Sequence, residues 1–509
     1  MNKIDFSDLT KKRQDWVRVN KENSFDEGIK KLLTDLYPDN AHFIYELLQN
    51  AEDKEATEVK FKLVEDELRF THNGEKFNRE HIDGITSIGN GTSVKDINKI
   101  GKFGVGFKAV FAYTSTPKIY SEDCNFEISD LVVPTVIESI IPDSKDTLMV
   151  LPFNSSKKAK NKAYNEIYRG LQNIHDNTLL FLTNIKKISY SLGDKVYNIE
   201  REEIDDTIVK ITNSKNSTVT KWLRFKKYLP RKDKLYVSVA FEVAIDKNTN
   251  EEYIKPINGQ VSIFFPAEKE KSNLKFHIHA PFSSTVARDS IKDLPVNNEL
   301  RDLISDLLLD VLKYVKRNQL LDYNFLDCMP NNEDNLSEFY LPIQRKLVDY
   351  FNNNKFLVTD RGIHRSASEC FLINTKEARS VLSKNILKDF MSYFNNRNFE
   401  NIYYLDSEKL KYKTRRKSFI EMLKIEKFDD TKLFDILEKL ANESDENITG
   451  MIQSESDKCF RDLYVFLNRK HSNCFLDNSQ FKKFILLTQL HHINIKNYTK
   501  TPYFLIQNP

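Results

Sequence analysis

Two short stretches of the sequence carry residues whose types and spacing could bind a nucleotide. In the first stretch, residues 46–53, the polar side chains Glu46, Asn50 and Asp53 are spaced by four and then three positions. At 3.6 residues per turn, these side chains fall within roughly 60° of one another around a helix. A carboxylate and a carboxamide held together in this way can supply a general base beside an oxygen ligand for Mg²⁺. We therefore predict a helix with a polar edge that faces a ligand.

The second stretch, residues 100–108, places Gly101, Gly104 and Gly106 in a loop that runs into a helix. Glycines in such a loop let backbone N–H groups turn toward a phosphate. Each stretch alone also occurs without a ligand, as a solvated helix edge or as an ordinary turn. Between them, residues 59–64 and 68–71 alternate apolar and polar side chains around a turn, which predicts a hairpin. The two stretches in this order, with the hairpin between them, favour a nucleotide site.

With these residues in place, the N-terminal part of the chain resembles the GHKL ATPases (Bergerat fold). This class includes gyrase, the large heat-shock chaperone, histidine kinases and the mismatch-repair ATPases. Residues 100–108 are most similar to the chaperone's phosphate-binding loop. Residues 36–53 and the downstream phrases at 179–188 and 276–282 are more similar to the sacsin and NO VEIN branch. The resemblance extends over about residues 20–330.

The resemblance implies a role for each matching residue. Glu46 would be the general base that polarises the attacking water, and Asn50 would hold the Mg²⁺ that bridges the ATP phosphates. Asp53 would orient that corner of the site, and Thr147 would lie near the adenine. The predicted cofactor-binding residues in these stretches are Asn50, Asp53, Gly101, Lys102, Phe103, Gly104, Val105, Gly106, Phe107 and Thr147.

One motif departs from the pattern of the class. The adenine amino group is normally read by an Asp in the sequence Asp-x-Gly-x-Gly, and His72 stands at that position here. Asn73 and Gly74 follow it, and Lys76 replaces the second glycine. The sacsin-like branch resembles this chain in having a His-Asn-Gly motif. A neutral imidazole or a carboxamide can accept a hydrogen bond, although without a fixed negative charge. We expect His72, Asn73 and Gly74 to contact adenine; alternatively, His72 only caps a turn.

Two more segments complete the predicted site. Residues 88–95 are small and polar, and in the resembled class this loop closes over bound nucleotide, with Thr92 as the predicted contact here. Arg288 matches, in a looser motif, the middle-domain arginine that the chaperone places against the γ-phosphate. An ordinary surface loop and a helix-capping arginine are the respective alternatives. His277 and His279 share a strand face, but no third ligand with suitable spacing favours a metal site there.

The composition is that of a multidomain intracellular protein. The chain has 509 residues, is 40% hydrophobic and carries a formal charge of +3, which does not indicate a nucleic-acid binder. No apolar run approaches the 18 or so residues that span a membrane, and the N-terminus has no signal-peptide pattern. The five cysteines have no paired spacing, so we expect reduced thiols and a cytoplasmic location.

We predict an α+β protein in three parts. Residues 1–154 would form a GHKL two-layer α/β sandwich, residues 155–327 a middle α/β domain resembling that of the heat-shock chaperone, and residues 328–509 a mainly helical region. In the last part, residues 409–417 hold six cations, which could contact nucleic-acid phosphates or form a solvated basic face. The apolar run at 503–506 suggests that the natural protein extends beyond residue 509. Helical patterns occur at residues 336–352, 378–394, 431–442, 459–468 and 480–490, with a short β-like insert at 356–362. In the middle part, a helical pattern occurs at residues 164–174.

These features lead to several functional hypotheses. The first is an ATP-gated conformational machine that hydrolyses ATP slowly with Mg²⁺, working as a homodimer or larger assembly that closes around nucleotide. The second is a nucleotide-binding sensor or scaffold without useful turnover. A nucleic-acid clamp is a further alternative, whereas too few residues precede Glu46 for the phosphoacceptor helix of a histidine kinase. The resemblance implies a chaperone-like role or a role in bacterial antiviral defence, with no membrane association and with a client that the sequence does not name.

Overall fold

The computed structural model describes residues 5–25, 28, 42–88, 106–141, 144–230, 232–285, 288–373, 388, 402–410 and 412–428. Thr92 and residues 101–105 lie outside these ranges, as do the predicted helices at 431–442, 459–468 and 480–490 and nearly all of 378–394. The chain divides into two compact units. The first comprises Met1–Tyr314 and Asp334–Gln344, and the second comprises Val315–Glu333 and Arg345–Pro509.

The described part of the first unit is built on one mixed sheet of 15 strands, so this unit is a mixed α/β structure. The strand order is β14-β13-β15-β11-β10-β9-β8-β7-β1-β2-β6-β3-β4-β5, with β12 paired to β11. The strands are β1 (Glu58–Val64), β2 (Glu67–His72), β3 (Lys118–Ser121), β4 (Cys124–Ser129), β5 (Val133–Val136), β6 (Thr147–Pro152), β7 (Lys187–Leu192), β8 (Lys195–Glu203), β9 (Ile208–Asn213), β10 (Thr218–Leu229), β11 (Lys232–Ile245), β12 (Glu252–Lys255), β13 (Val261–Ile263), β14 (Phe265–Pro266) and β15 (His277–His279).

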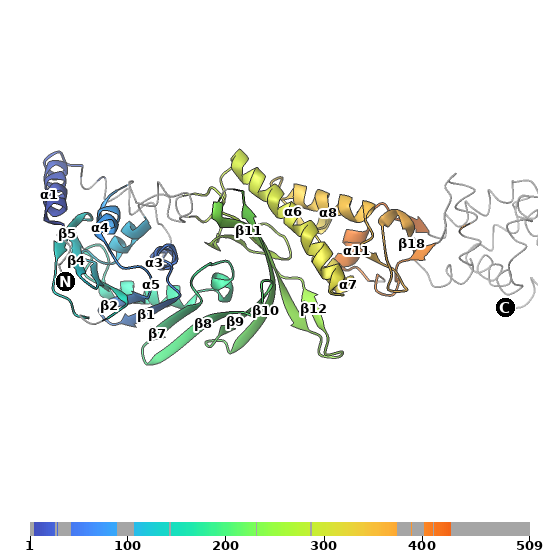
Figure 1. The fold of residues 1–509 in the computed structure, drawn as a ribbon, viewed down its shortest axis with the longest axis horizontal. Helices are drawn as coiled ribbons and strands as arrows, with labels where there is room; N and C mark the ends of the chain where they lie inside the picture. Colours follow the sequence, from blue (N-terminus) through green and yellow to red (C-terminus); the bar gives the residue numbers. More distant parts are fainter. Residues whose placement is uncertain are drawn as a thin grey trace, which may run out of the picture. The chain divides into compact units, whose positions relative to one another are not determined.

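The predicted hairpin is confirmed as β1 and β2, which pair in antiparallel register with Phe61 opposite Phe70. Alternate residues of β1 are buried, because one face of the strand packs on the core while the other faces solvent. Strand β1 also pairs in parallel with β7, which comes after residue 154 (Figure 1). The sheet is therefore continuous between the part of the chain before residue 154 and the part after it.

Helices pack on this sheet and carry the residues of interest. The predicted helix near 164–174 is confirmed as α5, whose Ala163, Ile167 and Leu171 are fully buried. Helix α4 begins with Asn78 as its N-cap, whose side chain accepts a hydrogen bond from the His81 N–H group at 2.9 Å. The described helices of the first unit are α1 (Ser7–Glu22), α3 (Phe43–Asp53), α4 (Arg79–Thr86), η2 (Gly106–Ala112), α5 (Lys160–Gln172) and η3 (Asp176–Leu179). Helix α6 (Pro295–Arg317) starts in this unit and ends in the second.

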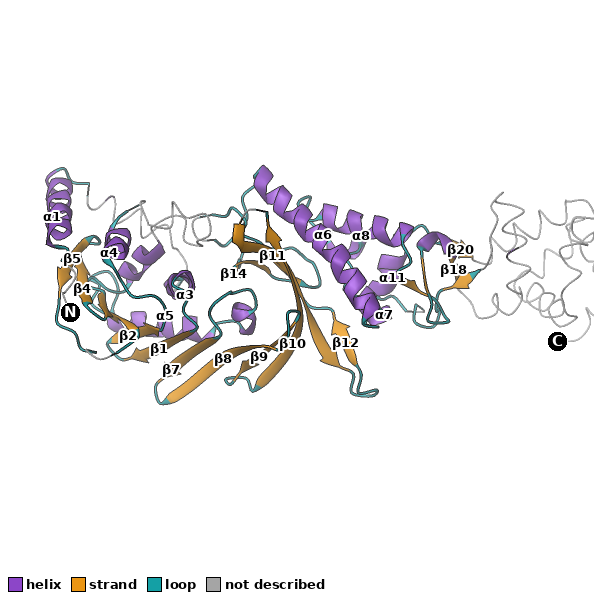
Figure 2. Cartoon of the chain, viewed as in Figure 1, coloured by secondary structure: helices purple, strands orange, loops and turns teal. Residues whose placement is uncertain are grey.

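The second unit contains both helices and strands in its described residues, so the prediction of a mainly helical region is not confirmed there. Strand β18 pairs in parallel with β19 and β20, and Figure 2 shows β18 and β20 side by side. The predicted helix at 336–352 is observed as α8, and the β-like insert as the hairpin of β16 and β17. The described elements are α7 (Tyr323–Leu326), η4 (Asn332–Asp334), α8 (Leu341–Asn353), β16 (Leu357–Val358), β17 (His364–Arg365), η5 (Ala367–Glu369), β18 (Cys370–Ile373), β19 (Tyr403–Tyr404), α11 (Arg415–Ile420) and β20 (Glu426–Phe428). The last residue of η4 and the first four residues of α8 belong to the first unit.

Two arginines of the basic segment at 409–417 bind Asp327 inside the second unit. The Arg415 Nε–H group donates to the Asp327 carbonyl oxygen at 2.8 Å, and Arg416 forms an ion pair with the Asp327 carboxylate. These contacts favour a structural role for both arginines. Elsewhere, Cys124, Cys328 and Cys370 are buried free thiols, and no described helix is long and apolar enough to cross a membrane.

Candidate functional site

Helix α3 places Glu46 at the edge of the core. Its apolar residues Leu47, Leu48 and Ala51 are fully buried, and the Glu46 side chain is only 5% exposed. Asn50 and Asp53, the other members of the predicted polar edge, are half-buried. The Nε2 atom of His42, just before the helix, lies 3.8 Å from Glu46 Oε1. The helix thus holds a largely desolvated carboxylate, with the half-buried Asn50 and Asp53 further along the same edge.

Glu46 and Arg288 line the same small pocket. The pocket is lined by His42, Tyr45, Glu46 and Gln49 from α3 and its N-cap, and by Phe265, Pro266, Glu268, Arg288 and Asp289 from later segments. Arg288 has a φ of 56°, in the left-handed region, and its N–H group donates to the Thr285 carbonyl oxygen at 3.1 Å. The tertiary structure therefore brings together the two residues that the sequence assigned to catalysis.

Gly106 lies directly against the Glu46 carboxylate. A Cβ atom built on Gly106 would overlap this carboxylate and would lie 2.7 Å from its Cδ atom. Any larger residue at this position would require the Glu46 carboxylate to move. The end of the predicted phosphate-binding loop is thus in contact with the predicted general base, while Gly101, Lys102, Phe103, Gly104 and Val105 lie outside the described residues.

Lys108, two residues further on, anchors this segment. Its ammonium group is buried and donates to the carbonyl oxygens of Ile85 at 2.7 Å and Leu131 at 2.6 Å. Burial lowers the pKa of Lys108 to about 7. These contacts fix the start of η2, and with it the buried Phe107, against the end of α4. No local pattern in the sequence marks this anchor.

His72 and Thr147 form a buried corner at the ends of β2 and β6. They are opposite each other in the β-sheet register. Thr147 Oγ1 lies 2.8 Å from Ser121 Oγ, which accepts a hydrogen bond from the Phe77 N–H group. Burial, with smaller contributions from Lys76 and Lys54, lowers the pKa of His72 to about 4, so its ring is neutral near pH 7.

The rest of the His-Asn-Gly motif is engaged in a turn. The Gly74 N–H group donates to His72 Nδ1 at 3.2 Å, and a Cβ atom on Gly74 would overlap the Lys54 carbonyl oxygen. Asn73 Oδ1 accepts from the N–H groups of Thr57 and Glu58 at 2.9 and 3.0 Å. Asn73 is exposed and holds the turn, so the structure does not bring its carboxamide into the His72 corner.

The two histidines of β15 are buried beside aromatic rings. His277 stacks on Trp222 and His279 on Phe181, and the Nδ1 atom of each lies within hydrogen-bond distance of a backbone N–H group. Burial lowers the pKa of His277 to about 4 and that of His279 to about 3. Among the described residues, no group of three or more His, Cys, Asp or Glu side chains could hold a metal ion. These observations support a structural role for both histidines.

Sequence reasoning missed one buried charge on α3. Glu52 is 3% exposed and binds the backbone of residues 183–185. Residues 179–188 stand out in the sequence only through a family resemblance, and nothing in their local pattern identifies Glu52 as their partner.

Comparisons with known proteins agree with one part of the resemblance. Residues 22–147 match the Sacsin domain. Over 342 residues, or 60% of this chain and 12% of the relative, the chain is 26% identical to Protein NO VEIN of Arabidopsis thaliana. Over 104 residues, or 17% of this chain and 2% of the relative, it is 34% identical to human sacsin. The chain is therefore similar to the sacsin-like branch and spans only a small fraction of the length of these relatives.

Among solved structures, the N-terminal domain of a DNA repair protein is similar to this chain, and the alignment covers 57% of this chain and 99% of that domain's chain. The sequence identity is 11% and the TM-score is 0.36. A similarity at this level carries no argument about function.

Proposed function

We propose that this chain binds Mg²⁺–ATP in a GHKL-type site on α3 and hydrolyses it slowly as part of a conformational cycle. The observation that supports this most directly is the pocket shared by Glu46 and Arg288. Gly106 packs against the Glu46 carboxylate. A general base, a cation and a glycine at a phosphate-binding loop are the groups that phosphoryl transfer to water requires.

Glu46 would act as the general base. Its carboxylate is buried but lines a pocket, so a single water held there could give up its proton without competition from bulk solvent. His42, close to Glu46 Oε1, could help to orient the carboxylate. Arg288 would neutralise the negative charge that develops on the transferred phosphoryl group.

Asn50 fits a magnesium ligand because it offers a hard oxygen donor on a half-buried position one turn after Glu46. The bound ion would supply charge neutralisation between the phosphates. At the other end of the site, the neutral His72 and Thr147 would contact adenine. Because Asn73 is held by Thr57 and Glu58, adenine recognition would rest on fewer protein contacts than the sequence predicts.

A nucleotide sensor without useful turnover is the second candidate. The neutral His72 at the position of the usual Asp favours it, because a neutral acceptor contributes less to binding than a charged one. A homodimer or larger assembly and a chaperone-like or defence role remain proposals of the resemblance alone. The nucleic-acid alternative is weakened by the contacts of Arg415 and Arg416 with Asp327.

The test separates binding from hydrolysis in the full chain. We expect calorimetry to detect Mg²⁺-dependent ATP binding, and Glu46→Gln to abolish turnover while changing the Kd by no more than about threefold. Asn50→Ala should instead weaken Mg²⁺–ATP binding, because it removes a ligand rather than a proton acceptor. Glu65→Gln, on the exposed β1–β2 turn, is the matched control. Equal loss of binding in the Glu46 and Asn50 variants would refute these roles, and wild-type turnover no faster than that of Glu46→Gln would favour the sensor.

A further inference from the structure

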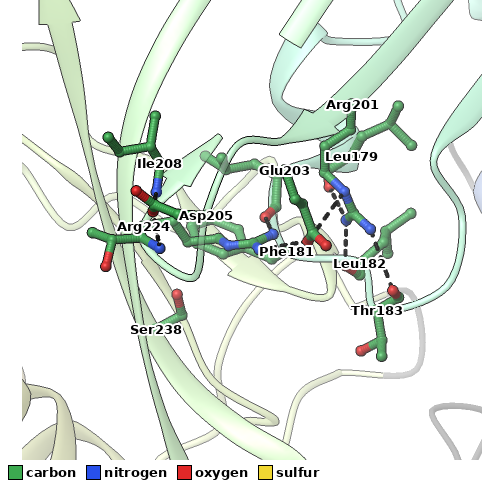
Figure 3. A network of polar contacts seen from close by, with 12 residues as sticks. Leu179, Phe181, Leu182, Thr183, Arg201, Glu203, Asp205, Ile208, Arg224 and Ser238 are labelled. Atoms are coloured by element: carbon green, nitrogen blue, oxygen red, sulfur yellow. Dashed lines mark hydrogen bonds and ion pairs between the residues drawn. The ribbon is translucent and has the colours of Figure 1, made fainter. Parts of the chain in front are cut away.

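The segment at residues 179–185, between η3 and β7, is held by buried charged groups on two sides. Figure 3 shows the side formed by Arg201 of β8 and Arg224 of β10, which lie among the carbonyl groups of this segment. The other side is formed by Glu52 of α3. Because Glu52 belongs to the helix that carries Glu46, the segment connects the candidate site to the second half of the sheet.

Glu52 binds three successive backbone N–H groups. Its Oε1 atom accepts from Thr183 at 2.6 Å and from Asn184 at 2.8 Å, and its Oε2 atom accepts from Ile185 at 2.9 Å. The Asn184 side chain also donates to the Glu52 carbonyl oxygen at 3.1 Å. Burial raises the pKa of Glu52, and these hydrogen bonds and the charge of Arg201 partly oppose that rise.

The arginines bind the carbonyl groups of the same segment. Arg201 donates to the carbonyl oxygens of Leu179 at 2.6 Å, of Leu182, and of Thr183 at 3.3 Å. Arg224 donates to the Leu180 carbonyl oxygen at 2.9 Å and to the Glu203 carboxylate at 2.6 Å. The Tyr236 hydroxyl of β11 donates to the Phe181 carbonyl oxygen.

Two consecutive peptide groups bridge the opposite charges. In the peptide between Leu182 and Thr183, the carbonyl binds Arg201 and the N–H group binds Glu52. The next peptide, between Thr183 and Asn184, repeats this arrangement. Both peptide dipoles are thus aligned between a carboxylate and a guanidinium. The two peptide groups are themselves planar and rigid, and buried side chains hold them from both ends.

We propose that Glu52 and Arg201 are positioning residues that set the place of Glu46 relative to Arg288. Arg201 attaches β8, and Arg224 attaches β10, to the segment at 179–185. Strand β10 pairs with β11, and β11 pairs with β15. Arg288 follows β15 in the sequence. The two groups of residues that line the pocket are therefore joined through this link, which we name the 179–185 clamp. The catalytic part of this inference rests on the proposed ATPase function.

The test uses the full chain and Glu52→Gln, which keeps the size of the side chain and removes its charge. We expect kcat to fall by about tenfold to a hundredfold, because small misplacements of catalytic groups are costly. The Kd for Mg²⁺–ATP should change by no more than about threefold, because no nucleotide-binding group is altered. Arg201→Lys, which cannot reach three carbonyl groups at once, should reproduce this split, and Glu65→Gln should behave as wild type.

A second measurement tests the clamp without nucleotide. The sequence has two tryptophans, Trp16 and Trp222, and Trp222 lies on β10 two residues before Arg224. In a Trp16→Phe background, Glu52→Gln and Arg201→Lys should each increase acrylamide quenching of Trp222. If quenching and kcat both stay at wild-type values in these variants, the proposal is overturned. Increased quenching in a protein that does not bind ATP would support the mechanical link and reject the ATPase function instead.

Discussion

His72 should make the folded protein lose stability as the pH falls from about 6.5 to about 4. Burial lowers the pKa of its imidazole from 6.5 to about 4 in the folded chain. In this window the unfolded chain binds a proton at His72 and the folded chain does not, so the free energy of unfolding decreases as the pH decreases. At about 1.36 kcal/mol for each pH unit, the difference corresponds to about 3 kcal/mol.

The perturbation that isolates this effect is His72→Asn, because asparagine does not titrate and its carbonyl can still accept the Gly74 N–H group. Urea unfolding at pH 7.0, 5.5 and 4.5 would be followed by tryptophan fluorescence, since Trp16 and Trp222 both belong to the first unit. Between pH 7.0 and 4.5 we expect the wild type to lose about 2.5 kcal/mol more than the variant, because the assay covers about two pH units of this window. His277 and His279 contribute to both curves equally. Parallel curves for the two proteins would refute the assignment of a neutral, buried His72.

Two other substitutions test the pocket on α3. Gly106→Ala should displace the Glu46 carboxylate, because the added Cβ atom would overlap it. We expect turnover to fall by about tenfold or more in an ATPase assay. Unchanged turnover would show that the carboxylate can move without consequence. Arg288→Gln should lower kcat by about a hundredfold or more, while Mg²⁺–ATP binding in calorimetry stays nearly constant. Arg288→Lys should recover part of the rate. Equal kcat in wild type and Arg288→Gln would limit Arg288 to a structural role at its backbone hydrogen bond with Thr285.

Local pattern was sufficient to predict the elements that carry the candidate site. The alternation at 59–71 predicted β1 and β2, and the polar edge of residues 46–53 predicted the helix on which Glu46 lies. These predictions succeed because side-chain periodicity is a property of neighbouring residues, and because a hairpin fixes its own register. By contrast, only the family resemblance related His72 to Thr147, and it is the pairing of β2 with β6, two strands remote in sequence, that sets them opposite each other.

Tertiary structure decided the contacts that shape the site. Gly106 lies against Glu46, Arg288 reaches the same pocket, and Asn73 is committed to a turn rather than to the His72 corner. Glu52 binds the N–H group of Thr183, which is 131 positions away in the sequence. Every non-proline residue has a backbone N–H and C=O group, so no residue type marks the peptides that a distant charge will bind. The sequence therefore determined which side chains could perform chemistry, and the packing of remote segments determined which of them meet.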